Sequence, residues 1–357
     1  MDRSERRRIK QHIMSWGTGT HRPAATPGGA AATIALADRE HLAAVIGSGL
    51  TGPGTVVLAP GDDDAASGVV GYDGFLAEPG ADFSIGDDFY LQTQDYASSA
   101  FMSVLGPTLI RITDRDDFAL FLADADRAVA EGVFPDFAVA PSVCVADAPA
   151  LGAGRGIDGA GLRLHVDADG TVSTSPSGSP LGTVGTPFAE LAGAWERINA
   201  AGDLPCGVCL GAAVPESERV TALLARPYTG RYLTAVDALR TMTVNDVAGV
   251  RVSGFGDRIT PGLTAAPVAG AYAADLLDPA LPVVLWNDER AYVFEPTAGR
   301  VFTVDRVSAR AVESLLVTGS ASAAAGYVPA AAVAKVERFF AGRGVSLAGE
   351  RITAGAR

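Results

Sequence analysis

The sequence has few of the residues on which several classes of protein depend. Lysine occurs only at Lys10 and Lys335, cysteine three times and histidine four times among 357 residues. Three cysteines are too few for a secreted disulfide scaffold, and their odd number fits a reducing cytoplasm. No apolar run approaches the roughly 18 residues that a membrane-spanning helix needs. We therefore expect a cytoplasmic protein with no membrane partner.

Positive charge is also scarce, because 28 basic residues face 41 acidic ones and leave a net charge of −13. Such a chain repels a phosphate backbone, so we expect no nucleic-acid partner. The charge is uneven: residues 1–11 carry +3 and residues 279–357 carry +2, which leaves −18 on residues 12–278. The 48% hydrophobic content is that of a folded chain.

Motifs typical of catalysis are missing, with no G-x-S-x-G, H-E-x-x-H or Walker A sequence. A G-x-G-x-x-G match at 47–52 follows an expected helix and precedes an expected strand, the reverse of a dinucleotide site. We interpret it as a turn that ends a helix. The acidic groups at 62–64, 87–88 and 114–117 match no calcium loop and predict solvated surface and helix caps. We expect no catalytic residue, no cofactor and no metal.

Cys206 and Cys209 form a C-x-x-C sequence, which occurs in redox pairs and in half zinc sites. Zinc needs two more ligands, and Cys144 and the histidines show no paired spacing. We favour buried structural cysteines, and the sequence leaves redox or metal chemistry open.

The chain divides by composition into four segments. Residues 1–31 are expected to form a flexible basic arm and lead-in, in which Met14 offers a second start. Residues 32–150 predict an α/β domain, because apolar strand-like and amphipathic helical segments alternate. Residues 151–278 predict a mixed α/β region that ends in a Gly/Pro-rich linker, and residues 279–357 a separate module. The expected elements include strands at 33–37, 55–59 and 108–112, a helix at 114–130, a hairpin at 162–174, and helices at 215–226 and 231–242.

The C-terminal module has a clear pattern. Short apolar segments joined by turn-type sequences predict a three-stranded meander, and helical spacing follows it. The fold class is therefore α/β (α+β) for the N-terminal body, plus a winged-helix-like module of a three-stranded sheet followed by three helices. The strands are expected at 282–286, 291–295 and 300–305, a helix capped by Asp305 at 307–316, a short helix at 320–325, and a last helix from Pro329.

This arrangement favours peptide binding. A third strand at the edge of the sheet leaves N–H and C=O groups unpaired, and an extended peptide can add there as a further strand. Basic side chains beside that edge favour an acidic peptide; they are Arg300, Arg306, Lys335 and Arg338.

LWNDERAYVFEPTAGRVFTVDRVSARAVESL followed by VPAAAVAKVERFFAGRGVSL resembles the PqqD-like precursor-peptide recognition element of RiPP biosynthesis, the pathways of ribosomally made, post-translationally modified peptides. The resemblance covers under a quarter of the chain. It rests on a short G-R-V-hydrophobic-hydrophobic-Asp strand, a helix, a short helix and a last helix with a Gly-aliphatic tail. The Ala-rich segment 320–326 departs from the pattern, which puts the short helix in question.

The rest of the chain, with WGTG at 16–19, LQTQDY at 91–96, AFMSVLGPTLIRI at 100–112 and RYLTAVDALR at 231–240, resembles the recognition proteins of daptide biosynthesis. The resemblance implies a non-catalytic cytoplasmic protein that binds the leader of a precursor peptide. It also implies a partner oxidative decarboxylase similar to iron-dependent alcohol dehydrogenases, to which the peptide is delivered.

The PqqD-like resemblance implies that the leader pairs with the third strand and lies against the last helix. The residues carried over are Val301, Phe302, Thr303 and Val304 on the strand, Val333, Val336, Glu337 and Phe340 on the helix, with Arg300 and Lys335 beside them.

Two other functions remain open at this point. The α/β body could be a peptide-modifying enzyme fused to its own recognition element, with a pocket that gathers Asp87, Asp88, His165 and Cys206. A winged helix could also read a DNA groove, although the acidic body and the few bases on the last helix argue against it.

Overall fold

The computed structural model describes residues 2–20, 29–64, 68–104, 106–153, 158–263 and 272–347. It separates into two compact units: unit 1 holds residues 1–121 and 142–225, and unit 2 holds residues 122–141 and 226–357. The boundary expected at residue 150 is not found because a single sheet continues from residue 33 to residue 183, and the one expected at residue 278 is not found because the sheet of unit 2 begins at residue 251.

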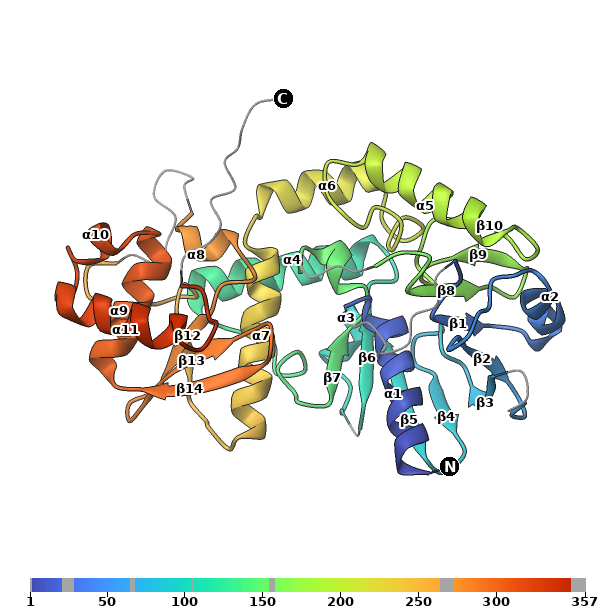
Figure 1. The fold of residues 1–357 in the computed structure, drawn as a ribbon, viewed down its shortest axis with the longest axis horizontal. Helices are drawn as coiled ribbons and strands as arrows, with labels where there is room; N and C mark the ends of the chain where they lie inside the picture. Colours follow the sequence, from blue (N-terminus) through green and yellow to red (C-terminus); the bar gives the residue numbers. More distant parts are fainter. Residues whose placement is uncertain are drawn as a thin grey trace. The chain divides into compact units, whose positions relative to one another are not determined.

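Unit 1 is organised around a mixed sheet with, among the described residues, ten strands in the order β10-β9-β8-β1-β2-β3-β4-β5-β6-β7 (Figure 1). The α/β layer expected from the sequence is therefore present. β8, β1, β2 and β3 run parallel, and so do β5, β6 and β7, while β4 is antiparallel to both of its neighbours. The strands are β1 (Thr33–Leu36), β2 (Val56–Pro60), β3 (Val69–Gly74), β4 (Asp82–Ile85), β5 (Phe89–Asp95), β6 (Thr108–Arg111), β7 (Val143–Val145), β8 (Arg163–Val166), β9 (Thr171–Ser173) and β10 (Gly182–Thr183).

The helices of unit 1 follow the predicted caps and periodicities in most places. The expected helices at 114–130 and 215–226 and the hairpin at 162–174 are confirmed. The Gly-rich match at 47–52 is confirmed as a helix end, because α2 stops at Gly47 and the next strand begins at Val56. The helices are α1 (Arg3–Thr18), α2 (Leu42–Gly47), α3 (Tyr96–Ser99), α4 (Arg115–Glu131, whose second half belongs to unit 2), α5 (Phe188–Ala201) and α6 (Glu216–Ala225), with 3-10 turns at η1 (Arg39–His41) and η3 (Ala148–Leu151).

The N-terminal segment is ordered, and the expectation of a flexible arm is wrong for residues 2–20. Asp2 caps α1, whose Ile9, Ile13 and Trp16 are buried in one core with side chains of β1 to β6. The Trp16 indole Nε1 donates a hydrogen bond to the Leu164 carbonyl of β8 at 3.0 Å. The basic residues therefore lie on a helix whose other face is part of the core. Residues 21–28 of the expected lead-in lie outside the described residues.

Unit 2 contains an antiparallel sheet with four strands among the described residues, in the order β11-β12-β13-β14 (Figure 1). The three strands and three helices expected at 282–341 are present in the expected order. The sheet is wider than expected because β11, from outside residues 279–357, pairs with β12. The elements are α7 (Thr229–Val244), β11 (Arg251–Val252), α8 (Ala274–Leu277), β12 (Val283–Trp286), β13 (Ala291–Glu295), β14 (Arg300–Val304), α9 (Arg306–Thr318), α10 (Ala321–Ala324) and α11 (Ala330–Ala341).

The core of unit 2 lies between this sheet and its helices, and α9 supplies much of it through Val312, Leu315 and Leu316. Asp305 caps α9, as expected, by accepting a hydrogen bond from the Ser308 N–H at 2.7 Å. No helix in the described parts of either unit is long and apolar enough to cross a membrane.

Candidate functional site

Among the described residues, no strand pairs with one side of the β14 backbone. A hydrogen bond from the Asn287 N–H across the β12–β13 turn sets the alternation of the antiparallel ladder, so Val293 of β13 and Phe302 of β14 form a hydrogen-bonded pair. The neighbouring residues Val301 and Thr303 then direct their N–H and C=O groups away from β13. Because β14 ends the strand order of the described sheet, these groups face its open edge.

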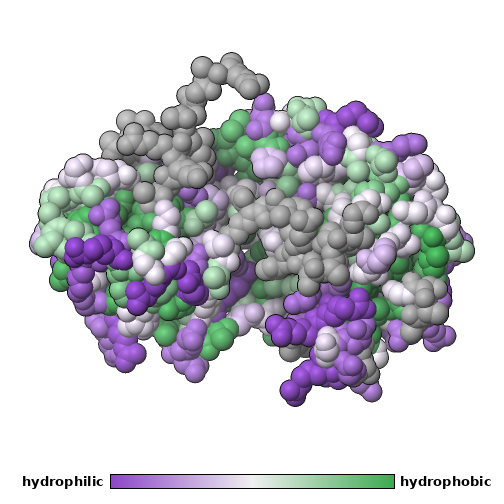
Figure 2. All heavy atoms as spheres, in the orientation of Figure 1, coloured by the Kyte–Doolittle hydropathy of each residue, from purple (hydrophilic) through white to green (hydrophobic). Residues whose placement is uncertain are grey.

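Aromatic and arginine side chains lie beside this strand. The Phe302 ring packs against α11, with its centroid 6.2 Å from that of Phe339, which is 38% exposed. The Arg300 guanidinium lies 5.7 Å from the Phe302 ring centroid, and that of Arg343 lies 3.6 Å from the Phe339 centroid. We call these four residues the aromatic edge. Figure 2 shows hydrophilic and hydrophobic residues intermixed on the visible surface of the helices and strands of unit 2.

The expected strand residues are placed where a peptide could meet them, but most of the expected helix residues are not. Val333, Val336 and Phe340 of α11 are buried in the core of unit 2. Their spacing of three and four residues forms the stripe that packs against the sheet, so they cannot contact a peptide without opening the core. Glu337 and Lys335 are exposed. The sequence-based assignment missed Phe339 and Arg343, which the structure places beside β14.

The basic residues near the edge already have partners. The Arg300 Nε lies 3.2 Å from the Glu295 carboxylate, and Arg306 donates to the carbonyls of Asn287 and Asp288. The pKa of Asp305 is lowered mainly by its backbone hydrogen bond from Ser308, with a smaller contribution from the charge of Lys335. The positive potential expected at this edge is therefore partly balanced by nearby acidic and carbonyl groups.

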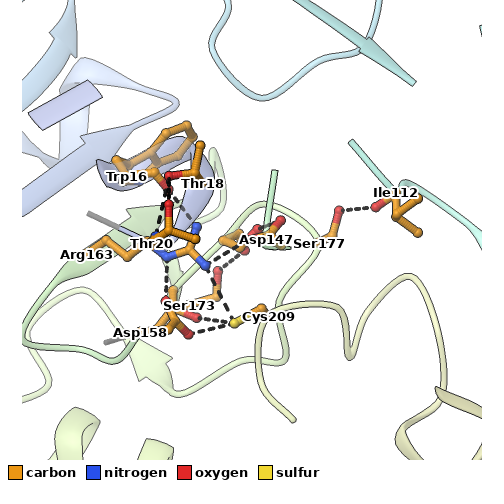
Figure 3. Close-up of polar contacts among 12 residues, drawn as sticks. Trp16, Thr18, Thr20, Ile112, Asp147, Asp158, Arg163, Ser173, Ser177 and Cys209 are labelled. Atoms are coloured by element: carbon orange, nitrogen blue, oxygen red, sulfur yellow. Dashed lines mark hydrogen bonds and ion pairs between the residues drawn. The ribbon is translucent and has the colours of Figure 1, made fainter. Parts of the chain in front are cut away.

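A second cluster of chemically active side chains is buried in unit 1 around Arg163 (Figure 3). The Arg163 Nε donates to Asp158 Oδ1 at 2.6 Å, and its Nη2 forms an ion pair with Asp147 Oδ1 at 2.7 Å. The Cys209 Sγ donates to the other Asp158 oxygen, Oδ2, at 2.6 Å, and also accepts from Arg163 Nη2 at 3.6 Å. Cys206 lies beside Cys209 with a positive φ of 61°, a strained conformation for a residue with a side chain.

The charges in this cluster are set by burial and by one another. Burial alone would lower the pKa of Arg163, but the carboxylates of Asp158 and Asp147 raise it well above its ordinary value. The pKa of the Cys209 thiol is raised by a hydrogen bond with Cys206, by burial and by the Asp158 charge, so the thiol stays protonated at neutral pH.

Arg111 and His165 are also fully buried near this cluster. Burial lowers the pKa of Arg111 to about 10, with Arg163 also lowering it and Asp147 opposing the change. Its guanidinium lies 5.2 Å from the Trp16 ring centroid and has no hydrogen-bond partner within the described part of the chain. Burial and the Arg111 charge lower the pKa of His165 to about 3, so this histidine is neutral at neutral pH.

Among the described residues, one group of cysteine, histidine and carboxylate side chains converges closely enough to share an ion. It consists of Asp158, Cys206 and Cys209, whose donor atoms all lie within 4.8 Å of one another and are buried. Sequence reasoning found the two cysteines but missed Asp158. The third cysteine, Cys144, is on β7 and is not a member.

The four residues named for an enzyme pocket do not converge in this way. Asp88 forms an ion pair with Arg6 at 2.5 Å, and Asp87 is exposed in the same β4–β5 turn. The His165 ring packs against Trp16, with centroids 5.8 Å apart. Cys206 belongs instead to the group with Asp158.

Comparison with known proteins finds no matching family, no similar curated protein and no similar solved structure.

Proposed function

We propose that this chain is a non-catalytic recognition protein that binds the leader of a RiPP precursor peptide at the open edge of β14. The observation that carries the proposal is the pair of outward-facing backbone positions, Val301 and Thr303, beside the exposed ring of Phe339. The three strands and three helices of residues 283–341 follow one another in the order expected of a PqqD-like element, and this order supports the proposal.

In this proposal the leader adds to the sheet as a further strand. The N–H and C=O groups of Val301 and Thr303 pair with the peptide backbone, which gives affinity with little dependence on sequence. A leader side chain packs against Phe339, and Arg343 and Arg300 favour an acidic leader by steering and register. Glu337 and Lys335 are exposed on the same helix and can contact peptide side chains.

The delivery step is the part of the proposal that rests on the resemblance to daptide recognition proteins. The chain would hold the precursor and present it, in the cytoplasm, to a partner oxidative decarboxylase similar to iron-dependent alcohol dehydrogenases. In this proposal the partner enzyme binds a surface of the chain other than the β14 edge, so the leader can occupy that edge at the same time.

The test measures fluorescence anisotropy of labelled leader peptides, taken from precursor genes beside this one, with the full chain. Thr303→Pro removes an outward N–H without removing a bond to β13, and edge strands tolerate proline in that orientation. We expect this variant to lose leader binding while it stays folded, and Thr303→Val, which keeps the N–H, to bind as the wild type does. Phe302→Pro is less informative, because the Phe302 N–H faces β13 and its loss disturbs the sheet itself.

Equal leader affinity of folded Thr303→Pro and Thr303→Val would contradict binding at this edge. If the wild-type chain binds none of the leader peptides from the neighbouring precursor genes, the proposed recognition function is wrong.

A further inference from the structure

The group of Asp158, Cys206 and Cys209 in unit 1 has no role in peptide recognition at β14. Its three donor atoms come from two separate segments, the one before β8 and the α5–α6 connection. All three residues are buried, so the convergence is not a chance meeting of exposed acids. The two cysteines are free thiols.

The donor types fit zinc better than a harder ion. Thiolates with one carboxylate oxygen suit Zn²⁺, whereas calcium and magnesium require oxygen ligands. Zinc takes sulfur at about 2.3 Å and carboxylate oxygen at about 2.0–2.2 Å. In tetrahedral geometry these lengths separate a sulfur and an oxygen by about 3.5 Å, so the 2.6 Å contact between Cys209 Sγ and Asp158 Oδ2 lengthens by about 1 Å when the ion enters.

The charge balance of the buried cluster also fits a divalent ion. In the site without an ion, the guanidinium groups of Arg111 and Arg163 balance the carboxylates of Asp147 and Asp158. Binding of Zn²⁺ adds two positive charges, and release of the two thiol protons to solvent adds two negative charges. The site is neutral before and after, so no uncompensated charge is buried.

Arg163 provides the outer support that metal ligands need. Its Nε holds Asp158 through Oδ1, which leaves Oδ2 directed at the Cys209 sulfur (Figure 3). Its Nη2, 3.6 Å from Cys209 Sγ, can donate to the thiolate. The backbone carbonyl of Trp16 and the Asp147 carboxylate fix the guanidinium in turn.

We propose that Asp158, Cys206 and Cys209 bind one Zn²⁺ ion, with a water molecule as the fourth ligand. The ion links the α5–α6 connection to the segment before β8, and its binding stabilises unit 1. Binding is independent of the leader, so loss of zinc and loss of leader affinity are separate outcomes.

The test measures zinc content by mass spectrometry of the elements. The full chain, without a histidine tag, is purified under a phosphine reductant in zinc-containing buffer and then freed of loose ions. We expect about one zinc per chain for the wild type, and at least about tenfold less for Cys206→Ser and Asp158→Asn. Cys144→Ser is the matched control, because this cysteine lies outside the group, and it should retain the wild-type content.

If a variant does not fold, two further measurements on the wild-type chain test zinc binding. Co²⁺ added to the reduced wild-type chain should give the near-ultraviolet thiolate-to-cobalt absorption band, and a strong chelator should lower the melting temperature. Zinc content below about a tenth of an ion per reduced chain, with no cobalt band, would overturn the proposal. So would equal zinc content in folded Cys206→Ser and Cys144→Ser, or a Cys206–Cys209 disulfide that persists under the reductant.

Discussion

His12 shows how one buried residue of α1 contributes to the response of the chain to acid. Burial, aided by the charge of Arg8, lowers the pKa of His12 from 6.5 to about 4. Its Nδ1 lies 2.8 Å from the Thr33 hydroxyl of β1. In the pH range between the two pKa values the unfolded chain binds more protons than the folded one. The free energy of unfolding therefore falls as the pH drops through this range.

The measurement is urea unfolding at about pH 7 and about pH 5. We expect the loss of stability between the two pH values to be smaller in His12→Gln than in the wild type, because the variant lacks the contribution of His12, whereas buried His165, whose pKa is also lowered, keeps its own contribution. His41→Gln removes a histidine outside the core and should keep the wild-type loss. An unchanged loss in His12→Gln would show that this residue does not couple folding to pH.

Two adjacent phenylalanines of α11 should separate binding from stability. Phe340 is buried in the core of unit 2, whereas Phe339 is 38% exposed beside β14. We expect Phe340→Ala to cost about 3–5 kcal/mol of unfolding free energy. Phe339→Ala should cost much less and instead weaken leader binding. Urea unfolding and peptide anisotropy on both variants test this, and a binding loss confined to Phe340→Ala would contradict the proposed aromatic edge.

At the scale of whole elements, α1 is part of the core rather than an appendage. Ile13 is buried among strands of the unit 1 sheet, and Lys10, three residues earlier on the same helix, is exposed. We expect Ile13→Ala to cost about 2–5 kcal/mol, the range for removing a buried aliphatic side chain. Lys10→Ala should have almost no effect. If Ile13→Ala and Lys10→Ala both lower the unfolding free energy, measured in urea, by the same small amount, α1 is not packed into the core as described.

The difference between α1 and α9 shows what the sequence could predict. In α9 a capping aspartate precedes a plain helical stripe of apolar residues, so cap and periodicity agree and the element was predicted well. In α1 the apolar residues Ile9, Ile13 and Trp16 also have helical spacing, but they lie within a run of basic residues. The basic composition favours an exposed arm and the periodicity favours a helix, and the structure follows the periodicity.

Elements and sites that depend on distant pairing could not be predicted from local patterns. β11 has two residues, too few for any periodicity, and is a strand only because it pairs with β12. Asp158 meets Cys206 and Cys209 only once β8 and the α5–α6 connection are folded, so no spacing announces it. The position of β14 at the end of its sheet could be predicted, because the meander pattern places the third strand at an edge.

At the scale of the whole molecule, the core of unit 2 is not made by residues 279–357 alone. Glu313 of α9 is 0% exposed and accepts hydrogen bonds from the Ser253 hydroxyl and from the N–H groups of Ile259 and Thr260. These partners, and β11, all precede residue 279. A fragment of residues 279–357 therefore keeps the buried carboxylate but loses the groups that satisfy it, which is a costly combination.

Because Glu313 depends on partners before residue 279, we expect Glu313→Leu to lower the stability of the full chain and to raise the stability of the fragment 279–357. In the full chain, Glu313→Leu leaves the N–H groups of Ile259 and Thr260 unpaired and should destabilise unit 2 by about 1–3 kcal/mol for each group. In the fragment 279–357, the same substitution removes an unpaired buried charge and should raise stability above that of the unmodified fragment. Urea unfolding followed by circular dichroism measures both, with Glu337→Leu, at an exposed position of α11, as the control. A fragment that unfolds cooperatively and is weakened by Glu313→Leu would show that residues 279–357 fold independently of the rest of unit 2.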